Sequence, residues 1–193
     1  MIDSSQRRNI VVPVNRCFDT HVDNHIVSAQ TVHGATFSSL YASGKYTEES
    51  LSMAIGKLLE NTNYKSLSEE EKPEGNRKRY PVGTVVDLPG YENEHFFLWA
   101  LSTFDNKLKA HTSMQEYALA VQKLIESCNE ESEGFPVVLP LVGTGLSRTK
   151  KDQQDVLKYL INAFRINKAE INCDIHIVVR NDIKNEIAIM NIK

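Results

Sequence analysis

The sequence predicts an α/β fold, a three-layer α/β/α sandwich with a mixed, largely parallel central sheet. Short apolar runs alternate along the chain with stretches whose apolar residues recur every three or four positions, a pattern typical of strands alternating with amphipathic helices. With 193 residues, 41% of them hydrophobic and 24% charged, the chain can bury a core without metals or disulfides. We therefore expect residues 1–193 to form one domain.

The composition argues against several classes of protein. The formal net charge of −3 lacks the basic excess that is typical of proteins bound to nucleic acid. Three cysteines without CxxC spacing predict a reducing, cytoplasmic location rather than a disulfide framework. No apolar run reaches the roughly 18 residues of a membrane helix.

The chain opens with a strand and a long polar loop. Residues 10–14 are all apolar, which predicts a buried strand. Because this strand begins so near the start, an upstream segment could be missing. Residues 15–34 are rich in Asp, His and Thr and predict a loop, with at most a helical turn near its end. A long loop that directly follows a strand is a common location for function.

A helix and a charged segment come next. Thr47, an acidic first turn and apolar residues at helical spacing predict a helix over residues 47–60. Residues 65–79 mix basic and acidic side chains with a proline and a glycine. We interpret this segment as a solvated excursion rather than a binding patch.

The middle of the chain predicts a hairpin and a helix. Residues 80–89 and 95–104 have strand composition and flank a short turn, so we expect an antiparallel pair. The apolar residues of 114–128 recur at helical spacing and predict a long helix packed on the sheet. We place Trp99 and Cys128 in the core rather than in a stacking platform or a reactive site.

The last part of the chain predicts strand, glycine loop, helix and strand in succession. Residues 135–142 form the first strand, 143–148 the loop, 151–167 the helix and 174–180 the last strand. The periodicity of residues 182–193 is compatible with a helix or a strand.

Two loops carry the candidate chemistry. Gly143 and Gly145 let backbone N–H groups converge on an oxyanion, although a tight strand-to-helix turn explains them equally well. The polar loop from Asn15 also follows the carboxyl end of a predicted central strand, where α/β sheets bind ligands. Together the loops suit a sugar-diphosphate, with backbone amides from one and polar side chains from the other.

These motifs resemble those of macro domains, whose pattern is a strand ending in V-N, a loop with V-D-x-x-I and a later P-x-x-G/S-T-G loop. Here they are Val14-Asn15, Val22-Asp23-Asn24-His25-Ile26 and Pro140-Leu-Val-Gly-Thr-Gly145. The stretches 12–15, 18–23 and 32–34 are more similar still to the macro-like, ligand-sensing domain of ThsA-type effectors in Thoeris anti-phage defence.

The resemblance implies a sensor of an ADP-ribose-derived nucleotide, such as an amino-acid conjugate of ADP-ribose made by a TIR-domain partner. It implies no cofactor beyond this ligand, no metal, no catalytic residue and no nucleic-acid partner. Assembly of like subunits could follow ligand binding. Some members carry an upstream membrane segment, which would place the domain at the inner face of the membrane.

Carried over by position, the resemblance also implies the binding residues. Asn15 would meet the ribose distal to adenine, and the residues of the first loop would edge that ribose and the diphosphate: Asp19, Thr20, His21, Val22, Asp23 and Ile26. The second loop would wrap the diphosphate with Gly143, Thr144, Gly145, Leu146 and Ser147. Arg148 would neutralise charge or stay solvated, Arg180 would cover the adenine side, and His33 would touch the ligand or cap a turn.

Three alternatives remain open. An ADP-ribosyl hydrolase would use Asp23 with Asn15 to position water, although the chain lacks the second asparagine and the glycines usual in hydrolytic macro domains. His21 and His25 could bind zinc together with nearby aspartates. Cys17 beside His21 could be an activated nucleophile, but no third catalytic group is evident.

Overall fold

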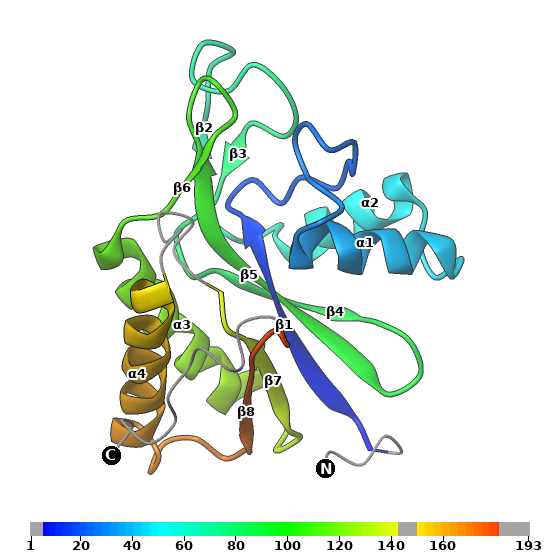
Figure 1. The fold of residues 1–193 in the computed structure, drawn as a ribbon. Coiled ribbons are helices and arrows are strands. Elements are labelled where there is room, and N and C mark those ends of the chain that lie inside the picture. Colours follow the sequence, from blue (N-terminus) through cyan, green and yellow to red (C-terminus); the bar gives the residue numbers. More distant parts are fainter. Residues whose placement is uncertain (1–5, 143–149, 182–193) are drawn as a thin grey trace.

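The computed structural model describes residues 6–142 and 150–181 (Figure 1). In these residues four parallel strands, one antiparallel edge strand and one short strand beside them form a six-stranded central sheet. Along the path β4-β5-β1-β7-β8 only β4 runs antiparallel to its neighbour, and a short sixth strand off this path is also antiparallel to β5. The strands are β1 (Arg8–Asn15), β4 (Val85–Pro89), β5 (Glu94–Phe104), β7 (Val137–Pro140) and β8 (Ile175–Val178). The expected α/β sandwich and the expected antiparallel pair are confirmed.

Alternating residues of β1 build the hydrophobic core on both faces of the sheet. Val11 packs in one cluster of buried side chains, whereas Val12 and Val14 pack in the other. This follows from the strand geometry, because successive side chains point to opposite faces. Trp99 of β5 is fully buried, and its Nε1–H donates to the backbone oxygen of Ala120 at 3.0 Å. Its predicted place in the core is confirmed.

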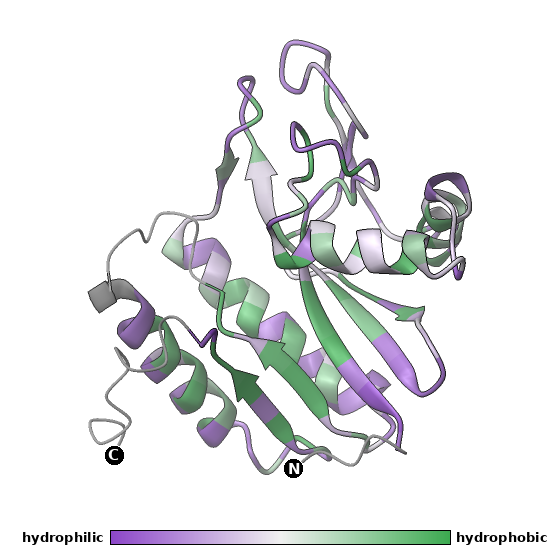
Figure 2. Ribbon diagram, turned by 45° about the vertical axis from the view of Figure 1, so that its right-hand side comes forward, coloured by the Kyte–Doolittle hydropathy of each residue, from purple (hydrophilic) through white to green (hydrophobic). Residues whose placement is uncertain are grey.

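Two pairs of helices cover the two faces. Figure 1 shows α1 (Val32–Ala42) and α2 (Glu48–Leu58) on one side, and α3 (Met114–Glu131) and α4 (Lys150–Ile166) on the other. In Figure 2 the two strands next to α3 and α4 are largely hydrophobic, while the loops above the sheet are mostly hydrophilic. The helices predicted at 47–60, 114–128 and 151–167 are confirmed within a few residues.

Local capping explains where two of these helices begin. The Thr47 side chain accepts the backbone N–H of Ser50, and the Ser50 side chain accepts the backbone N–H of Thr47. Ser113 and Glu116 form the same reciprocal pair at the start of α3. These capping boxes satisfy backbone donors that the first helical turn leaves unpaired.

Helix α1 was not predicted, because the sequence suggested only a turn near residue 34. Its segment contains Gly34 and two serines, and only Phe37 and Leu40 are large apolar residues at helical spacing that become buried. The side chain of Thr31 caps the helix by accepting the Gly34 N–H at 3.0 Å. Packing against the sheet rather than periodicity therefore determines this helix.

The prediction of a solvated excursion over residues 65–79 was wrong in one respect. The segment contains the short hairpin β2 (Lys65–Ser66) and β3 (Lys78–Arg79), as well as a fully buried lysine, Lys72. The carboxylate paired with this lysine is Asp19, 53 residues away, so no local pattern could reveal it. A further short strand, β6 (Ala110–His111), pairs with β5.

Two predicted segments, 143–148 and 182–193, lie outside the described residues. Among the residues that are described, no helix is long and apolar enough to span a bilayer.

Candidate ligand-binding site

The ends of two neighbouring parallel strands define the edge of the sheet where the candidate site lies. β1 pairs with β7 in parallel, with Ile10 opposite Val138, so their carboxyl ends reach the same edge. β1 continues to Asn15, where the first polar loop starts, and β7 leads toward residues 143–148. This is the edge at which parallel α/β sheets bind ligands.

Asn15 uses one end of its side-chain amide to shape the loop, and the other end is buried next to Asp19. Its Oδ1 accepts the backbone N–H groups of Cys17 at 3.0 Å and Asp19 at 3.4 Å. Its Nδ2 is buried, and its hydrogen bond with the Asp19 carboxylate, which acts to lower that group's pKa, falls short of normal geometry. A buried amide with so poor a partner would form a better hydrogen bond with a suitably placed acceptor.

His33 supplies a second buried nitrogen of the same kind. Its ring stacks edge-on against Phe37, 4.6 Å between centroids, and Nε2 has no hydrogen-bond partner among the described residues. Burial lowers the pKa of His33 to about 4, while a hydrogen bond with the Asp19 backbone acts in the other direction. The ring is therefore neutral at pH 7 and can offer a ligand either a donor or an acceptor.

Asp19 and Thr20 are both buried, and both hold the loop in place. The Asp19 carboxylate pairs with Lys72, with Nζ 2.9 Å from Oδ2, and Oδ1 accepts the Asn76 backbone N–H at 2.6 Å. Burial raises the pKa of Asp19, although Lys72 and Asn76 act to lower it. The backbone oxygen of Thr20 accepts the Tyr41 hydroxyl at 2.6 Å. The predicted ligand contacts of Asp19 and Thr20 remain predictions.

The rest of the first loop forms an exposed rim. His21 Nδ1 lies 2.8 Å from a carboxylate oxygen of Glu48, and this hydrogen bond raises the pKa of His21. Asp23 Oδ1 accepts two backbone N–H groups of the loop, both at 2.8 Å. His25 faces Glu74 at 3.4 Å instead. The two histidines thus pair with different carboxylates, and no described group of three or more His, Cys, Asp or Glu side chains is arranged to hold a metal ion.

A hollow of about 510 Å³ lies between this rim and the start of α2. It brings His21 beside Glu48 and Glu49, two residues that sequence reasoning did not connect with the site. Its lining residues are Asp19, Thr20, His21, Glu48, Glu49, Ser52, Met53, Gly75 and Asn76. Of the predicted loop residues, Asp19, Thr20 and His21 thus border a space that can admit part of a ligand.

The remaining predicted ligand-binding residues fall into three groups according to where they lie. Val22 packs at the edge of the core, and Ile26 is partly exposed. Arg180 follows β8 with an exposed side chain. Residues Gly143, Thr144, Gly145, Leu146, Ser147 and Arg148 lie outside the described residues.

The Cys17 thiol does not have the environment of an activated nucleophile. It is buried, and this burial raises its pKa to about 11. An activated thiol has a pKa shifted in the opposite direction.

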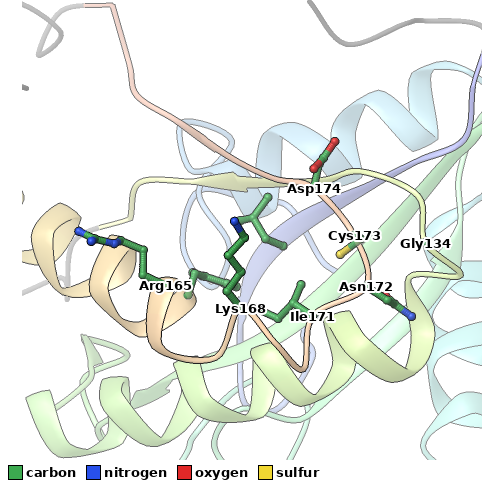
Figure 3. A pocket seen from close by; sticks show the side chains of 9 residues that line it. Gly134, Arg165, Lys168, Ile171, Asn172, Cys173 and Asp174 are labelled. Atoms are coloured by element: carbon green, nitrogen blue, oxygen red, sulfur yellow. The ribbon is translucent and has the colours of Figure 1, made fainter.

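A separate cavity of about 530 Å³ lies at the opposite edge of the sheet. Figure 3 shows the side chains that line it, including Arg165, Lys168, Cys173 and Asp174. Gly134 and Asp174 precede β7 and β8, so this cavity is at the amino ends of the strands. We keep the candidate site at the carboxyl edge, because the buried Asn15 Nδ2 and His33 Nε2 are there.

The mixed sheet, the helices on both faces and the polar loop that begins at Asn15 define a macro domain. The chain belongs to the family of ThsA macro domains, since residues 4–180 match the model described as "Thoeris protein ThsA, Macro domain". It is 26% identical over 166 residues to a Thoeris protein ThsA from Bacillus amyloliquefaciens strain Y2. That match covers 83% of this chain and 52% of the relative, so the chain spans about half of the relative's length.

Proposed function

We propose that this domain is the ligand sensor of a Thoeris effector and binds an ADP-ribose-derived nucleotide without cleaving it. In this proposal the ligand is ADP-ribose or an amino-acid conjugate of ADP-ribose, made by a TIR-domain partner. Binding would drive assembly or activation of the complete effector, at the membrane where an upstream membrane segment is present. Membership of the ThsA macro-domain family supports the sensor role.

The observation that carries the proposal is the pair of buried nitrogens at the carboxyl edge of β1. Asn15 Nδ2 and His33 Nε2 come from different elements, both groups interact with Asp19, and neither has a hydrogen-bond partner of normal geometry among the described residues. Ribose hydroxyls and phosphate oxygens can accept from the amide, and a hydroxyl can also donate to the imidazole. A sugar-phosphate ligand therefore satisfies both groups.

Isothermal titration with ADP-ribose, compared with its amino-acid conjugates, tests the proposal directly. We expect saturable binding, and chromatography of the recovered ligand should return it intact. Asn15→Ala should weaken binding by the loss of about 1–3 kcal/mol, which is roughly 5- to 150-fold. Asn129→Ala is the matched control, because Asn129 is an exposed residue near the end of α3.

Two outcomes would contradict the sensor. If none of these ligands produced heat in the titration or a shift in melting temperature, the proposed class of ligand would be wrong. A cleaved ligand, with cleavage abolished by Asp23→Ala, would instead support the ADP-ribosyl hydrolase.

A further inference from the structure

The side chain of Lys72 is completely buried. Its relative exposure is 0%, and that of Asp19 is 2%. Lys72 Nζ lies 2.9 Å and 3.1 Å from the two carboxylate oxygens of Asp19, and it also donates to the backbone oxygens of Glu74 at 2.7 Å and Asn76 at 2.9 Å. Every donor of the ammonium group therefore has an acceptor.

The same segment also binds the backbone of the first loop. The side-chain amide of Asn76 donates to the backbone oxygens of Cys17 at 3.2 Å and Phe18 at 3.1 Å, while its backbone N–H donates to Asp19. Residues 72–76 thus contact three successive residues of the loop. These contacts begin two residues after Asn15, the residue that we assign to the ligand.

The loop needs such external support, because its backbone is strained. Phe18 has a φ of 50°, in the left-handed region that non-glycine residues rarely occupy. Strained conformations of this kind persist only when surrounding contacts hold them, and they concentrate at functional sites. This conformation brings the Cys17 and Asp19 amides to Asn15 Oδ1, which fixes the direction of the Asn15 side chain.

A buried ion pair often contributes little net stability to a protein. Well-packed apolar side chains of similar volume commonly replace such pairs without loss of stability, whereas a paired charge in the interior selects one geometry. We therefore interpret the ion pair between Lys72 and Asp19 as a contact that positions the first loop rather than one that stabilises the fold.

Gly75 gives independent evidence of how closely the two segments approach. Its φ is +75°, and a Cβ built there would lie 2.3 Å from Asp19 Oδ1 and 2.7 Å from Lys72 Nζ. The buried pair leaves no room for a side chain at this position. Gly44 has almost the same φ, +73°, but a Cβ there meets nothing within 4 Å.

We propose that Lys72 is a positioning residue of the ligand site, which through its buried pair with Asp19 fixes the loop that carries Asn15. Residues 72–76 are then part of the binding site although none of them needs to touch the ligand. This inference rests on the proposed function for its effect on affinity, but its effect on the loop can be measured without any ligand.

Gly75→Ala and Gly44→Ala form a matched pair that tests the inference. Both introduce the same left-handed strain, but only Gly75→Ala pushes on the buried pair. We expect Gly75→Ala to weaken binding of ADP-ribose at least tenfold and Gly44→Ala to change it less than twofold, with both proteins folded by circular dichroism. Equal affinities for the two folded variants would overturn the proposal.

Affinity of a double variant and hydrogen exchange test the inference further, in case Gly75→Ala does not fold. The double variant Lys72→Met with Asp19→Asn removes the charges together and keeps an acceptor for the Asn76 N–H, so it should fold even if Gly75→Ala does not. It should also lose at least tenfold in affinity, and wild-type affinity would refute the positioning role.

Hydrogen exchange separates this inference from the proposed function. In the double variant, the backbone amides at positions 17 and 19 should exchange at least tenfold faster, relative to their intrinsic rates, while amides of β8 keep their rates. If wild-type protein binds no ADP-ribose but the exchange result holds, the proposed function fails and the loop is still positioned by Lys72. Unchanged exchange at both amides would refute the inference whatever the ligand.

Discussion

Replacing Gly34 with alanine should destabilise the protein through a contact between α1 and the backbone of the first loop. A Cβ at Gly34 would lie 2.2 Å from the carbonyl oxygen of Ser28, 2.7 Å from its carbon and 3.0 Å from Ala29 Cα. Favourable non-bonded separations are about 3.5–4.0 Å between carbon atoms, so the overlap is on the order of 1 Å. Because all of these atoms belong to the backbone, no side chain can turn away to relieve it.

The expected magnitude follows from two opposing contributions. Overpacking of this kind costs about 1–3 kcal/mol, whereas alanine gains about 0.5–1 kcal/mol over glycine inside a helix. The cost of the overlap exceeds the gain in helix propensity, so we expect the free energy of unfolding to fall by about 1–2 kcal/mol. For a domain of this size, the melting temperature should fall by roughly 2–8 °C.

Gly56→Ala is the control, because Gly56 lies inside α2 and a Cβ there meets nothing within 4 Å. It should gain about 0.5–1 kcal/mol from helix propensity alone. Urea denaturation followed by circular dichroism measures both variants under the same conditions. If Gly34→Ala were stabilised like Gly56→Ala, the close approach of α1 to Ser28 would not exist in solution, and the reasoning would be refuted.

Three other results are expected. Since the pKa of His33 is about 4 in the folded protein against 6.5 for an ordinary histidine, the unfolded chain takes up a proton first as the pH falls. Stability should therefore decline between about pH 6.5 and 4 by up to about 3 kcal/mol in urea titrations, and a His33→Phe variant that keeps the full decline would contradict this. Iodoacetamide at neutral pH should label Cys173 before the buried Cys17 and Cys128, because its hydrogen bond with Cys128 lowers the pKa of Cys173; equal labelling in peptide mass maps would refute the difference. Trp99 is fully buried, so its fluorescence should resist acrylamide until the protein unfolds, and quenching in the native state would show that the core is open.

The five strands of the path β4-β5-β1-β7-β8 and three of the helices could be predicted because their patterns are local. The apolar run at 10–14 and the helical spacing of 114–128 both depend on residues that are neighbours in sequence. Helix α1 could not be predicted in the same way, because Gly34 and its serines give a weak periodicity and the burial of Phe37 depends on the sheet. Where tertiary packing overrides propensity, a single sequence carries little signal.

The candidate site was predictable in part for the same reason. Asn15 and the polar loop behind it follow a strand, which is a local signal of a binding edge. The roles of Lys72 and Asn76 depend on contacts with residues more than fifty positions away, inside a segment whose composition is typical of a solvated surface. Only a pairing between distant positions could have indicated that this segment belongs to the site.

The position of β1 in the sheet has a consequence for how the protein is made. β1 is translated before the strands beside it, and its contacts lie far downstream: Arg8 bonds to Glu94, 86 residues later, and Asn9 bonds to Ser132, 123 residues later. At synthesis rates of about 5–20 residues per second, the nascent strand waits roughly 4 to 17 s for β5 and longer for β7. During that interval its backbone edges and apolar side chains are unpaired and can join a β1 strand on a neighbouring ribosome. Soluble yield should therefore depend on chaperones that shield β1, more than on the stability of the finished fold.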